Sequence, residues 1–414
     1  MRIEPFRMER MQSTYENYVD FNLSESGVHP MTPLELLQDV EEPERLLSRE
    51  LGYCQSNGSE TLRDRIALFY PGAARENVLV SNGGSEANYA TLWSLLEKGD
   101  RVAYMLPNYL QTWGLSRAYA GMVDPFRLVR RRDADRTRWA LDVEGLHRAV
   151  TKRTRLILVT NPNNPTGAVL TADEMDEVVR AARRFGAWIV ADEIYRGAEL
   201  SGRTIPSFWG RYERVLVTAG LSKAFGLPGL RIGWIVGPAR AVQRAWSYRD
   251  YTTIAPGLLS DHLAGIAMEP SRREAILART RSIIRANLPV LEDWVRAHGE
   301  ILEYTAPEAG AIAFMRYRLS IGSIPLVDRL RLERSVLIIP GDHFGSARHI
   351  RIGYGSERVY LVKGLERIGE MFRALRAAAR WPAARGGTRR GRRPGAARRR
   401  AAAPRRGRAA GATA

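Results

Sequence analysis

The hydrophobic residues between positions 78 and 236 fall into short apolar runs separated by longer polar or amphipathic segments. The runs occupy residues 78–81, 101–105, 155–160, 188–191, 214–217 and 232–236. Each run has the length of a strand and is apolar throughout, which is typical of strands buried on both faces. Strands of this kind that alternate with helices predict an α/β fold, with a mostly parallel sheet covered by helices.

Several segments between the runs carry the residues that begin and end helices. Thr171 and Glu174 form a capping box ahead of an apolar stripe, and Gly186 follows the last residue of that stripe. Ser59 stands in the capping position of a second predicted helix, and Gly99 follows a third. The pattern therefore predicts that helices connect the strands.

The rest of the chain differs from this alternation. Residues 1–44 show no long periodic segment, and we expect an arm with one short helix at 33–37. After residue 238 the pattern is helical over 239–268 and 272–298, then mixed, with apolar runs near 303–304, 311–314, 336–340 and 349–354 and a last helix over 356–379. We predict an arm with part of a small α+β domain (1–44), a large domain (45–264), the C-terminal small domain (265–380) and a tail (381–414).

Composition narrows the class of protein. Of the 414 residues, 45% are hydrophobic and 26% are charged, as in ordinary globular proteins. No apolar run approaches the length that spans a membrane, and the first residues lack the apolar segment of a secretory signal. The single cysteine, Cys54, excludes an internal disulfide and a cysteine-based metal site. We expect a cytoplasmic protein that uses no metal.

The net charge of +18 is concentrated at the C-terminus. Residues 381–414 hold eleven arginines and no acidic residue, which leaves +7 for the other 380 residues. Such a run of Arg, Ala, Gly and Pro buries too little apolar surface to fold, and we expect it to be disordered. A tail of this kind can neutralise nucleic-acid phosphates, but its arginines are not interleaved with aromatic residues for base stacking. A nucleic-acid-binding regulator is therefore the weaker alternative to an enzyme.

The stretch 220–234 places one lysine near one arginine. Lys223 lies among small residues between two apolar runs, and Arg231 follows eight positions later, beyond a Gly-Leu-Pro-Gly turn. A lysine that is at least half buried near another cation has a lowered pKa, which makes its amine nucleophilic toward an aldehyde. This arrangement favours a Schiff base between Lys223 and pyridoxal phosphate, with Arg231 on the phosphate. The alternative is that Lys223 is a surface lysine.

A glycine-rich turn follows the run 78–81. Gly83, Gly84 and Ser85 precede a predicted helix, so backbone N–H groups converge where the helix N-terminus adds partial positive charge. We interpret this turn as a phosphate-binding site. A tight strand-to-helix turn without a ligand has the same sequence pattern.

Polar or aromatic residues also follow the next three runs. Tyr109 is placed to stack on a flat ring, and Asn164 lies in the loop 161–167, where two prolines restrict the chain and an Asn-Pro bond is a candidate for cis. Asp192 directly follows a buried run, where a carboxylate needs a cation such as a protonated ring nitrogen. The Tyr195 hydroxyl is placed to reach the ring oxygen. A helix cap for Asp192 and core packing for the tyrosines are the structural alternatives.

Together these motifs resemble those of the fold-type I pyridoxal-phosphate enzymes, specifically the class I/II aminotransferases. The resemblance covers about residues 20–378 and follows the family's order of motifs. These are Gly-Gly-Ser-Glu-Ala (83–87), Pro-Asn-Tyr (107–109), Asn-Pro-Asn-Asn-Pro-Thr-Gly (161–167), Ala-Asp-Glu-Ile-Tyr (191–195), Ser-Lys-Ala-Phe-Gly-Leu-Pro-Gly-Leu-Arg-Ile-Gly-Trp (222–234) and His-Ile-Arg-Ile-Gly-Tyr-Gly (349–355).

The resemblance implies a cofactor role for individual residues. Lys223 would form the Schiff base and act as general base, Asp192 would keep the ring nitrogen protonated, and Tyr109 would stack on the ring. Asn164 and Tyr195 would hydrogen-bond the ring oxygen. The phosphate would be held by Gly83, Gly84, Ser85, Ser222 and Arg231.

The resemblance also implies substrate and partner contacts. Arg351 matches the arginine whose planar fork binds the α-carboxylate of the substrate, with Asn164 and Gly27 beside it. Tyr53 resembles the tyrosine that reaches the phosphate of the partner subunit, which implies a homodimer. Two departures accompany these matches: Gly220 stands where many members carry a phosphate-binding serine, and the segment 22–29 resembles capreomycidine synthases more than the common family pattern.

The activity that the resemblance implies is transfer of an amino group between an α-amino acid and a 2-oxo acid. The alternative is a lyase or cyclase that acts on an amino-acid derivative, because both reactions use the same cofactor-stabilised carbanion and the same cofactor motifs. No second arginine is assigned to a distal carboxylate, so a dicarboxylic substrate is neither supported nor excluded.

Overall fold

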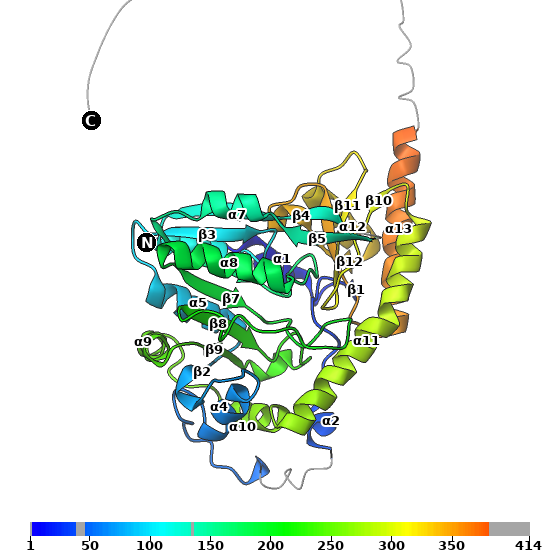
Figure 1. Cartoon of the computed structure of the whole chain (residues 1–414). Helices are drawn as coiled ribbons and strands as arrows, with labels where there is room; N and C mark the ends of the chain where they lie inside the picture. The colour runs from blue at the N-terminus through cyan, green and yellow to red at the C-terminus, as the bar shows by residue number, and fades with distance from the viewer. Residues whose placement is uncertain (1, 39–45, 134–135, 381–414) are drawn as a thin grey trace, which may run out of the picture.

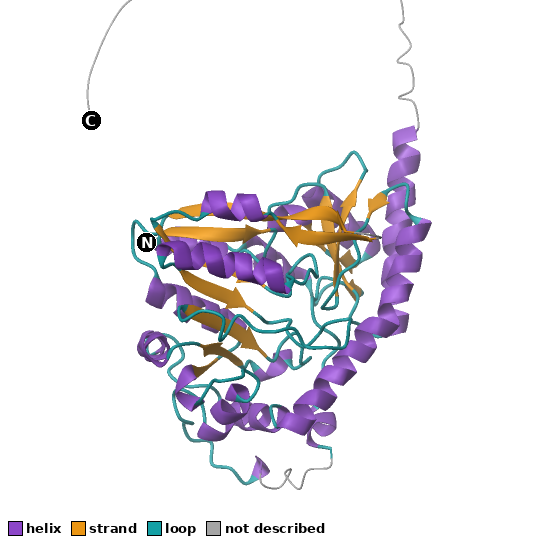
Figure 2. Cartoon of the chain, viewed as in Figure 1, coloured by secondary structure: helices purple, strands orange, loops and turns teal. Residues whose placement is uncertain are grey.

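The computed structural model describes residues 2–38, 46–133 and 136–380. Its main feature is an eight-stranded sheet (Figures 1 and 2). The tail predicted at 381–414 lies outside the described residues. The strand order is β2 (Val78–Ser81), β9 (Gly233–Val236), β8 (Val215–Gly220), β7 (Trp188–Asp192), β6 (Thr154–Thr160), β3 (Arg101–Leu106), β4 (Met122–Asp133) and β5 (Arg136–Leu141).

The sheet is mostly parallel, as predicted. The neighbours from β8 through β7, β6 and β3 to β4 are parallel, whereas β9 is antiparallel to both β2 and β8. The antiparallel pair β4 and β5 was not predicted. Phe126 and Leu128 of β4 are buried, but its arginine-rich end is largely exposed, so this hairpin lacks a continuous apolar run.

Helices cover both faces because successive side chains of each strand point to opposite sides. In β6, Leu156 and Leu158 pack in one hydrophobic cluster, while Ile157 and Val159 pack in another. The first face is covered by α5 (Gly84–Leu95), α6 (Gln111–Tyr119) and α9 (Ala239–Arg249). The second is covered by α4 (Glu60–Ala67), α7 (Val143–Ala149), α8 (Ala172–Phe185) and α10 (Leu258–Ala267).

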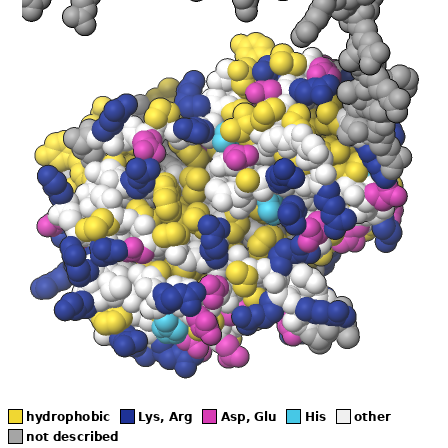
Figure 3. Space-filling view, turned by 90° about the horizontal axis from the view of Figure 1, so that it is seen from above, with side chains coloured by type: hydrophobic (Ala, Val, Ile, Leu, Met, Phe, Trp, Pro, Cys, Tyr) yellow, Lys and Arg dark blue, Asp and Glu magenta, His cyan; other side chains and the backbone are white. Residues whose placement is uncertain are grey.

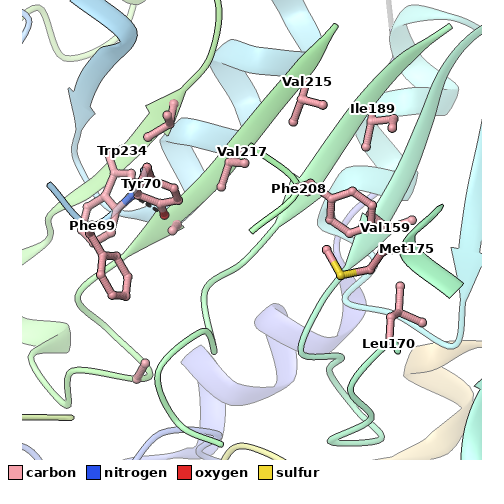
Figure 4. Packing of buried hydrophobic residues seen from close by; sticks show 14 of the residues in the cluster. Phe69, Tyr70, Val159, Leu170, Met175, Ile189, Phe208, Val215, Val217 and Trp234 are labelled. Carbon is pink, nitrogen blue, oxygen red and sulfur yellow. Dashed lines mark hydrogen bonds between the residues drawn. The ribbon is translucent and has the colours of Figure 1, made fainter. Parts of the chain in front are cut away.

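The second face forms the larger core (Figure 4). Val215 and Val217 of β8 point into it beside Ile189 of β7, and Met175 of α8 and Phe208 pack over them. Each such side chain that leaves water contributes about 1.5–3 kcal/mol to folding. The one polar pair in this view is the indole N–H of Trp234, which donates to the Tyr70 hydroxyl at 3.0 Å.

A smaller α+β region packs beside the large sheet. It contains an antiparallel sheet and a short parallel pair, crossed by three helices. The sheet order is β10 (Leu302–Glu303), β11 (Ile312–Tyr317), β14 (His349–Gly353) and β13 (Ile339–Pro340), the pair is β1 (Phe21–Asn22) with β12 (Val336–Leu337), and the helices are α11 (Pro270–Ala297), α12 (Ser323–Arg334) and α13 (Arg358–Arg380).

Helix α11 connects the two cores. Its Ile276 and Leu277 belong to the core of the large sheet, whereas Ile284 and Leu291 belong to the core of the smaller region. In Figure 1 the helix runs from the lower edge of the molecule to the side where α13 lies. The predicted domain boundary at 264/265 falls inside α10, one helix earlier than this crossing.

The structure corrects three expectations about helices. The segment 239–268 is not one helix but α9 and α10, which the turn at 250–257 separates. Helix α5 ends at Leu95 rather than at Gly99. Residues before 33, expected to lack a helix, contain α1 (Arg7–Tyr15) ahead of the predicted short helix α2 (Pro33–Leu37).

Helix α1 escapes detection in the sequence because it depends on tertiary contacts. A nine-residue helix is marginal in isolation, and most of its residues are polar. Its Met8 is buried in a cluster with Phe314, Ile339 and Phe344 of the smaller region. These contacts hold α1 over the carboxyl ends of the large sheet.

Charged side chains of both signs lie on the surface. On the face in Figure 3, Lys and Arg side chains are spread among acidic and neutral ones.

Within the described ranges, no helix combines the length and the apolar character needed to cross a bilayer.

Candidate active site

A cavity of about 260 Å³ lies at the carboxyl ends of β6, β7 and β8, under α1. Most of the residues predicted for the site line it. They are Gly84, Ser85, Tyr109, Asn164, Asp192, Tyr195, Ser222, Lys223 and Arg231. Parallel strands present the residues after their carboxyl ends at one edge of the sheet, which explains why segments far apart in sequence meet here.

Lys223 is set apart from the other lysines of the chain. The sequence contains four lysines, and Lys98, Lys152 and Lys363 are exposed, whereas Lys223 is half buried in the cavity. The surface-lysine alternative therefore does not describe this residue. Its Nζ lies 2.5 Å from Oε1 of Glu25.

The predicted lowering of the Lys223 pKa is wrong for this structure. Burial does act to lower the pKa of Lys223, but the negative charge of Glu25 outweighs it and the pKa is raised. Burial acts to raise the pKa of Glu25, yet Lys223 and the backbone N–H groups of Ser26 and Gly27 lower it to about 2. The two side chains form a charged pair at neutral pH.

Glu25 is a site residue that the sequence analysis missed. The N–H groups of Ser26 and Gly27 donate to its Oε1 at 2.7 and 3.0 Å and fix the carboxylate beside Lys223. It lies in the segment 22–29, which departs from the common family pattern. The departure of this segment from the family pattern is the feature of the sequence that points to Glu25.

Asp192 ends β7 and projects into the cavity. Its Oδ1 accepts the Ile194 N–H at 3.1 Å, but a turn and not a helix follows, so the helix-cap alternative does not hold. Its Oδ2 accepts from Nδ2 of Asn88 at 3.3 Å. Asn88 in turn accepts from the Thr218 hydroxyl at 2.6 Å. Burial raises the pKa of Asp192 to about 6, while its hydrogen bonds act in the opposite direction. A cation facing this carboxylate would stabilise its charged form.

Asn88→Ala tests whether this chain of hydrogen bonds holds Asp192 in place. The variant removes the donor to Asp192 and leaves the buried Thr218 hydroxyl without its acceptor. Losing such a bond to a charged group costs about 1–2 kcal/mol, so we expect roughly a tenfold lower kcat/KM. We also expect the acidic limb of the pH–rate profile to move to higher pH. An unchanged profile would contradict a role for Asn88 in positioning Asp192.

Glycines bring the turn before α5 close to Arg231. Gly83 has φ +84°, and a Cβ there would lie 2.6 Å from Nη2 of Arg231. A Cβ on Gly233 would lie 2.4 Å from the Gly83 carbonyl carbon. The guanidinium, the Ser85 and Ser222 side chains and the N-terminus of α5 therefore converge at one end of the cavity, where they fit a phosphate.

The close packing also explains the departure at Gly220. A Cβ at this position would lie 2.8 Å from the Ile232 carbonyl oxygen and 3.0 Å from Cα of Gly233. A serine does not fit unless β8 and β9 separate. The phosphate end of the cavity thus excludes the side chain that many family members carry here.

Gly83→Ala tests the phosphate end of the cavity. Alanine is strained at φ +84° and its Cβ displaces the Arg231 guanidinium, so about 1–3 kcal/mol of strain falls on the turn. We expect at least a roughly tenfold weaker affinity for pyridoxal phosphate. Titration of cofactor-free protein by absorbance measures it. Gly72→Ala, at φ +80° with open space around its Cβ, is the matched control.

Two tyrosines and an asparagine form the wall beside Lys223. The Tyr195 hydroxyl donates to Oγ of Ser26 at 2.8 Å, and the Tyr109 hydroxyl donates to Glu9 at 3.1 Å. Asn164 lies in the restricted loop, in which the Asn161–Pro162 and Asn164–Pro165 bonds are cis. Its Oδ1 accepts from Nη1 of Arg351 at 2.9 Å, so its amide N–H groups remain available to the cavity.

Arg351 lies directly behind this wall. The side chain is 1% exposed, and its Nη2 donates to the Ser24 carbonyl oxygen. Among the described residues, its Nε has no hydrogen-bond partner. A buried guanidinium with a free donor is suited to an incoming carboxylate.

Four predicted residues do not line the cavity: Gly83 and Arg351, described above, and Gly27 and Tyr53. Gly27 is buried against the Ser222 carbonyl oxygen, 3.2 Å from the position of a Cβ, so its close approach is to the chain beside Lys223. Tyr53 is 92% exposed on the loop before α4 and does not line the cavity of its own chain. Its predicted contact with a partner subunit is not tested by a single chain.

Comparisons with known proteins agree with this geometry. The sequence profile of the family Aminotransferase class I and II matches residues 22–368. The capreomycidine synthase of Streptomyces vinaceus is 30% identical over 354 residues, 84% of this chain and 89% of that protein. The aspartate aminotransferase of Streptomyces avermitilis is 29% identical over 310 residues, 71% of this chain and 74% of that protein.

Solved structures of two PLP-dependent enzymes share the fold of this chain. A PLP-dependent aminotransferase from Streptococcus suis superposes with a TM-score of 0.84 at 29% identity, over 91% of this chain and 99% of that one. The PLP-dependent cyclase OrfR superposes with a TM-score of 0.82 at 29% identity, over 91% of this chain and 98% of that one.

Proposed function

The chain belongs to the aminotransferase class I and II family and is a pyridoxal-phosphate-dependent transferase, and from this premise we propose that Lys223 and Asp192 are its catalytic centre. The reaction is transfer of an amino group between an α-amino acid and a 2-oxo acid. The observation that supports the centre is that an amine and a half-buried carboxylate line one cavity with an anion site at its end.

The side chains of the cavity fit the cofactor. Because Gly83 has no Cβ, the turn leaves room beside the Arg231 guanidinium for a phosphate group. The Asp192 carboxylate suits a protonated ring nitrogen. Tyr109 offers an aromatic face to the ring. The amide of Asn164 and the hydroxyl of Tyr195 are placed to donate to a ring oxygen.

Pyridoxal phosphate supplies an aldehyde and an electron-withdrawing ring that accepts the electron pair released when an α-proton is removed. Lys223 would hold the cofactor through its Nζ, and the same amine, when free, would remove the α-proton. Asp192 would hold a proton at the ring nitrogen, and the guanidinium of Arg351, directly behind Asn164, would bind the α-carboxylate. Tyr195, held by Ser26, donates to the ring oxygen.

A cyclase or lyase is the second candidate. It is favoured by the similarity to capreomycidine synthase and to OrfR, each of which matches most of the chain. The residues that bind the cofactor are common to both reactions, so they do not distinguish them.

Single-turnover experiments distinguish the two reactions. Purified protein loaded with pyridoxal phosphate is mixed with one amino acid at a time, and the cofactor absorption and the products are followed. Transamination predicts conversion to pyridoxamine phosphate with one equivalent of 2-oxo acid. Ammonia or a cyclic product without pyridoxamine phosphate would contradict it and support the second candidate.

We also propose that the protein is a homodimer. Large hydrophobic side chains are strongly exposed on two loops that lie side by side: Leu47, Leu51, Tyr53 and Tyr251 are 80–92% exposed. The thiol of Cys54 donates to the Pro256 carbonyl oxygen at 3.2 Å and joins the two loops. An apolar surface of this kind favours association with a second copy.

The dimer predicts a result in solution. Light scattering at micromolar concentration should give twice the mass of the 46.5 kDa chain. If Tyr53 reaches the cofactor phosphate of the partner subunit, Tyr53→Ala should weaken cofactor binding several-fold by removing one hydrogen bond to a charged group. A fully active monomer would contradict the proposal.

The cytoplasmic location and the domain boundaries stay predictions from the sequence.

A further inference from the structure

Helix α1 presents an acidic face to the cavity. Glu9, Gln12 and Glu16 recur at helical spacing and all three line the cavity, as does Glu25 below them. We call Glu9, Glu16 and Glu25 the acidic wall. Met8 of the same helix is anchored in the smaller region, so the position of this face is set by packing.

Little positive charge offsets the acidic wall. Glu25 pairs with Lys223 at 2.5 Å, and Glu9 accepts a hydrogen bond from the neutral Tyr109 hydroxyl. Within the described part of the chain, neither Glu9 nor Glu16 lies within ion-pair distance of a cation. Partial burial raises the pKa of Glu16, and the charges of Glu25 and Glu9 raise it further, so the three carboxylates act on one another.

The proposed function commits the one cation that the wall has. Lys223 would hold the cofactor and, as a released amine beside Glu25, take the α-proton, so it would not serve the substrate side chain. Arg231 would serve the phosphate and Arg351 the α-carboxylate, so both guanidinium groups are also committed. The substrate side chain would then meet the carboxylates of Glu9 and Glu16, which attract a cation and repel a carboxylate.

The acidic wall lies next to the α-carboxylate site. Nε2 of Gln12 donates to the Ser24 carbonyl oxygen at 3.0 Å, and Nη2 of Arg351 donates to the same oxygen. Helix α1 and Arg351 therefore share one anchor. A substrate held at its carboxylate by Arg351 has its side chain within the part of the cavity that α1 covers.

Resting on the proposed function, we propose that the amino-acid substrate carries a cationic side chain, an amine or a guanidinium, that Glu9 and Glu16 bind. Dicarboxylic amino acids are disfavoured at this site. The specificity thus differs from that named for the aspartate aminotransferase relative.

The test compares matched amino acids on the cofactor-loaded enzyme. L-Lysine and L-norleucine have side chains of similar length that differ in charge, and L-ornithine, L-arginine and L-aspartate extend the series. The expected kcat/KM for the best cationic amino acid is at least about tenfold above that for norleucine, with aspartate lowest. α-Methyl-lysine and α-methylaspartate, which lack the α-hydrogen, give dissociation constants by absorbance independently of turnover.

Variants assign the preference to α1. Glu9→Gln and Glu16→Gln keep the shape and the hydrogen-bonding capacity, and the double variant should lower the lysine-to-norleucine ratio by about tenfold. Glu76 is exposed in the short helical turn Arg75–Asn77 that precedes β2, outside the cavity. Glu76→Gln removes one carboxylate charge there and should leave the ratio unaltered. Circular dichroism checks that each variant folds.

The outcomes separate this inference from the proposed function. A ratio of lysine to norleucine near one, a preference for aspartate, or an unaltered ratio in the double variant would overturn the cationic substrate while leaving transamination intact. If no amino acid changes the cofactor absorption, the proposed function itself fails. A raised ratio that both glutamate substitutions abolish supports the inference.

Discussion

Lys223→Ala should lower kcat by at least about 10³-fold with any amino acid that the parent protein accepts. The substitution removes both the amine that attaches the cofactor and the base that takes the α-proton, and a general base alone contributes 10²–10⁴-fold. It also leaves Glu25 without its partner 2.5 Å away. The cofactor-loaded variant is measured by single-turnover absorbance, in which it should show almost no conversion.

The control for this prediction is Lys152→Ala, which removes an exposed lysine outside the cavity. It should react at the parental rate. Turnover of Lys223→Ala at a rate comparable to the parent would mean that another group performs both roles, and the catalytic centre proposed above would be wrong.

Asp192→Asn should lower kcat by about 10²–10³-fold. The amide keeps the size of the side chain but removes the negative charge that holds a proton at the ring nitrogen, and one preorganised electrostatic group is worth about that factor. Single-turnover rates at saturating amino acid measure the effect. Asp173→Asn on the exposed first turn of α8 is a matched control. A loss of less than tenfold would contradict the role of Asp192.

The same variant predicts a pH-dependent gain in stability of the cofactor-free protein. Burial raises the pKa of Asp192 from 3.8 to about 6, so the folded state binds a proton that the unfolded state releases. The parent therefore loses stability as pH rises from about 4 to about 6, and Asp192→Asn does not. Since Asp192 borders the cavity, we expect about 1–2 kcal/mol in favour of the variant at pH 7.5 and none at pH 4. Urea unfolding at both pH values measures this difference, and equal stability at pH 7.5 would contradict it.

The sequence predicts that most of the candidate site residues meet in one cavity, because they follow apolar strands. Asp192 is the last residue of β7, Ser222 and Lys223 follow β8 after one residue, and the sheet itself brings their side chains together. Gly83 and Gly84 are recognisable because a turn that approaches Arg231 so closely has no room for a Cβ. Local sequence and tertiary structure agree at these positions.

Arg351 was predicted for the substrate end, but helix α1, Glu25 and Asn88 were not, since they have no local signature. Helix α1 is short and polar, and the buried residues that Met8 packs with, Phe314, Ile339 and Phe344, lie more than 300 positions away. Glu25 gains its role from Lys223, 198 positions later, and Asn88 from Asp192, 104 positions later. The lowered pKa expected for Lys223 was wrong for the same reason, because the sequence did not show that Glu25 is its neighbour.

Reductive trapping of the cofactor tests the central claim most directly. The cofactor-loaded protein is treated with borohydride, digested and mapped by mass spectrometry, and the four lysines of the chain are the possible attachment points. The account predicts one reduced cofactor per chain, on the peptide that contains Lys223. Attachment at Lys98, Lys152 or Lys363, or no covalent attachment, would contradict it.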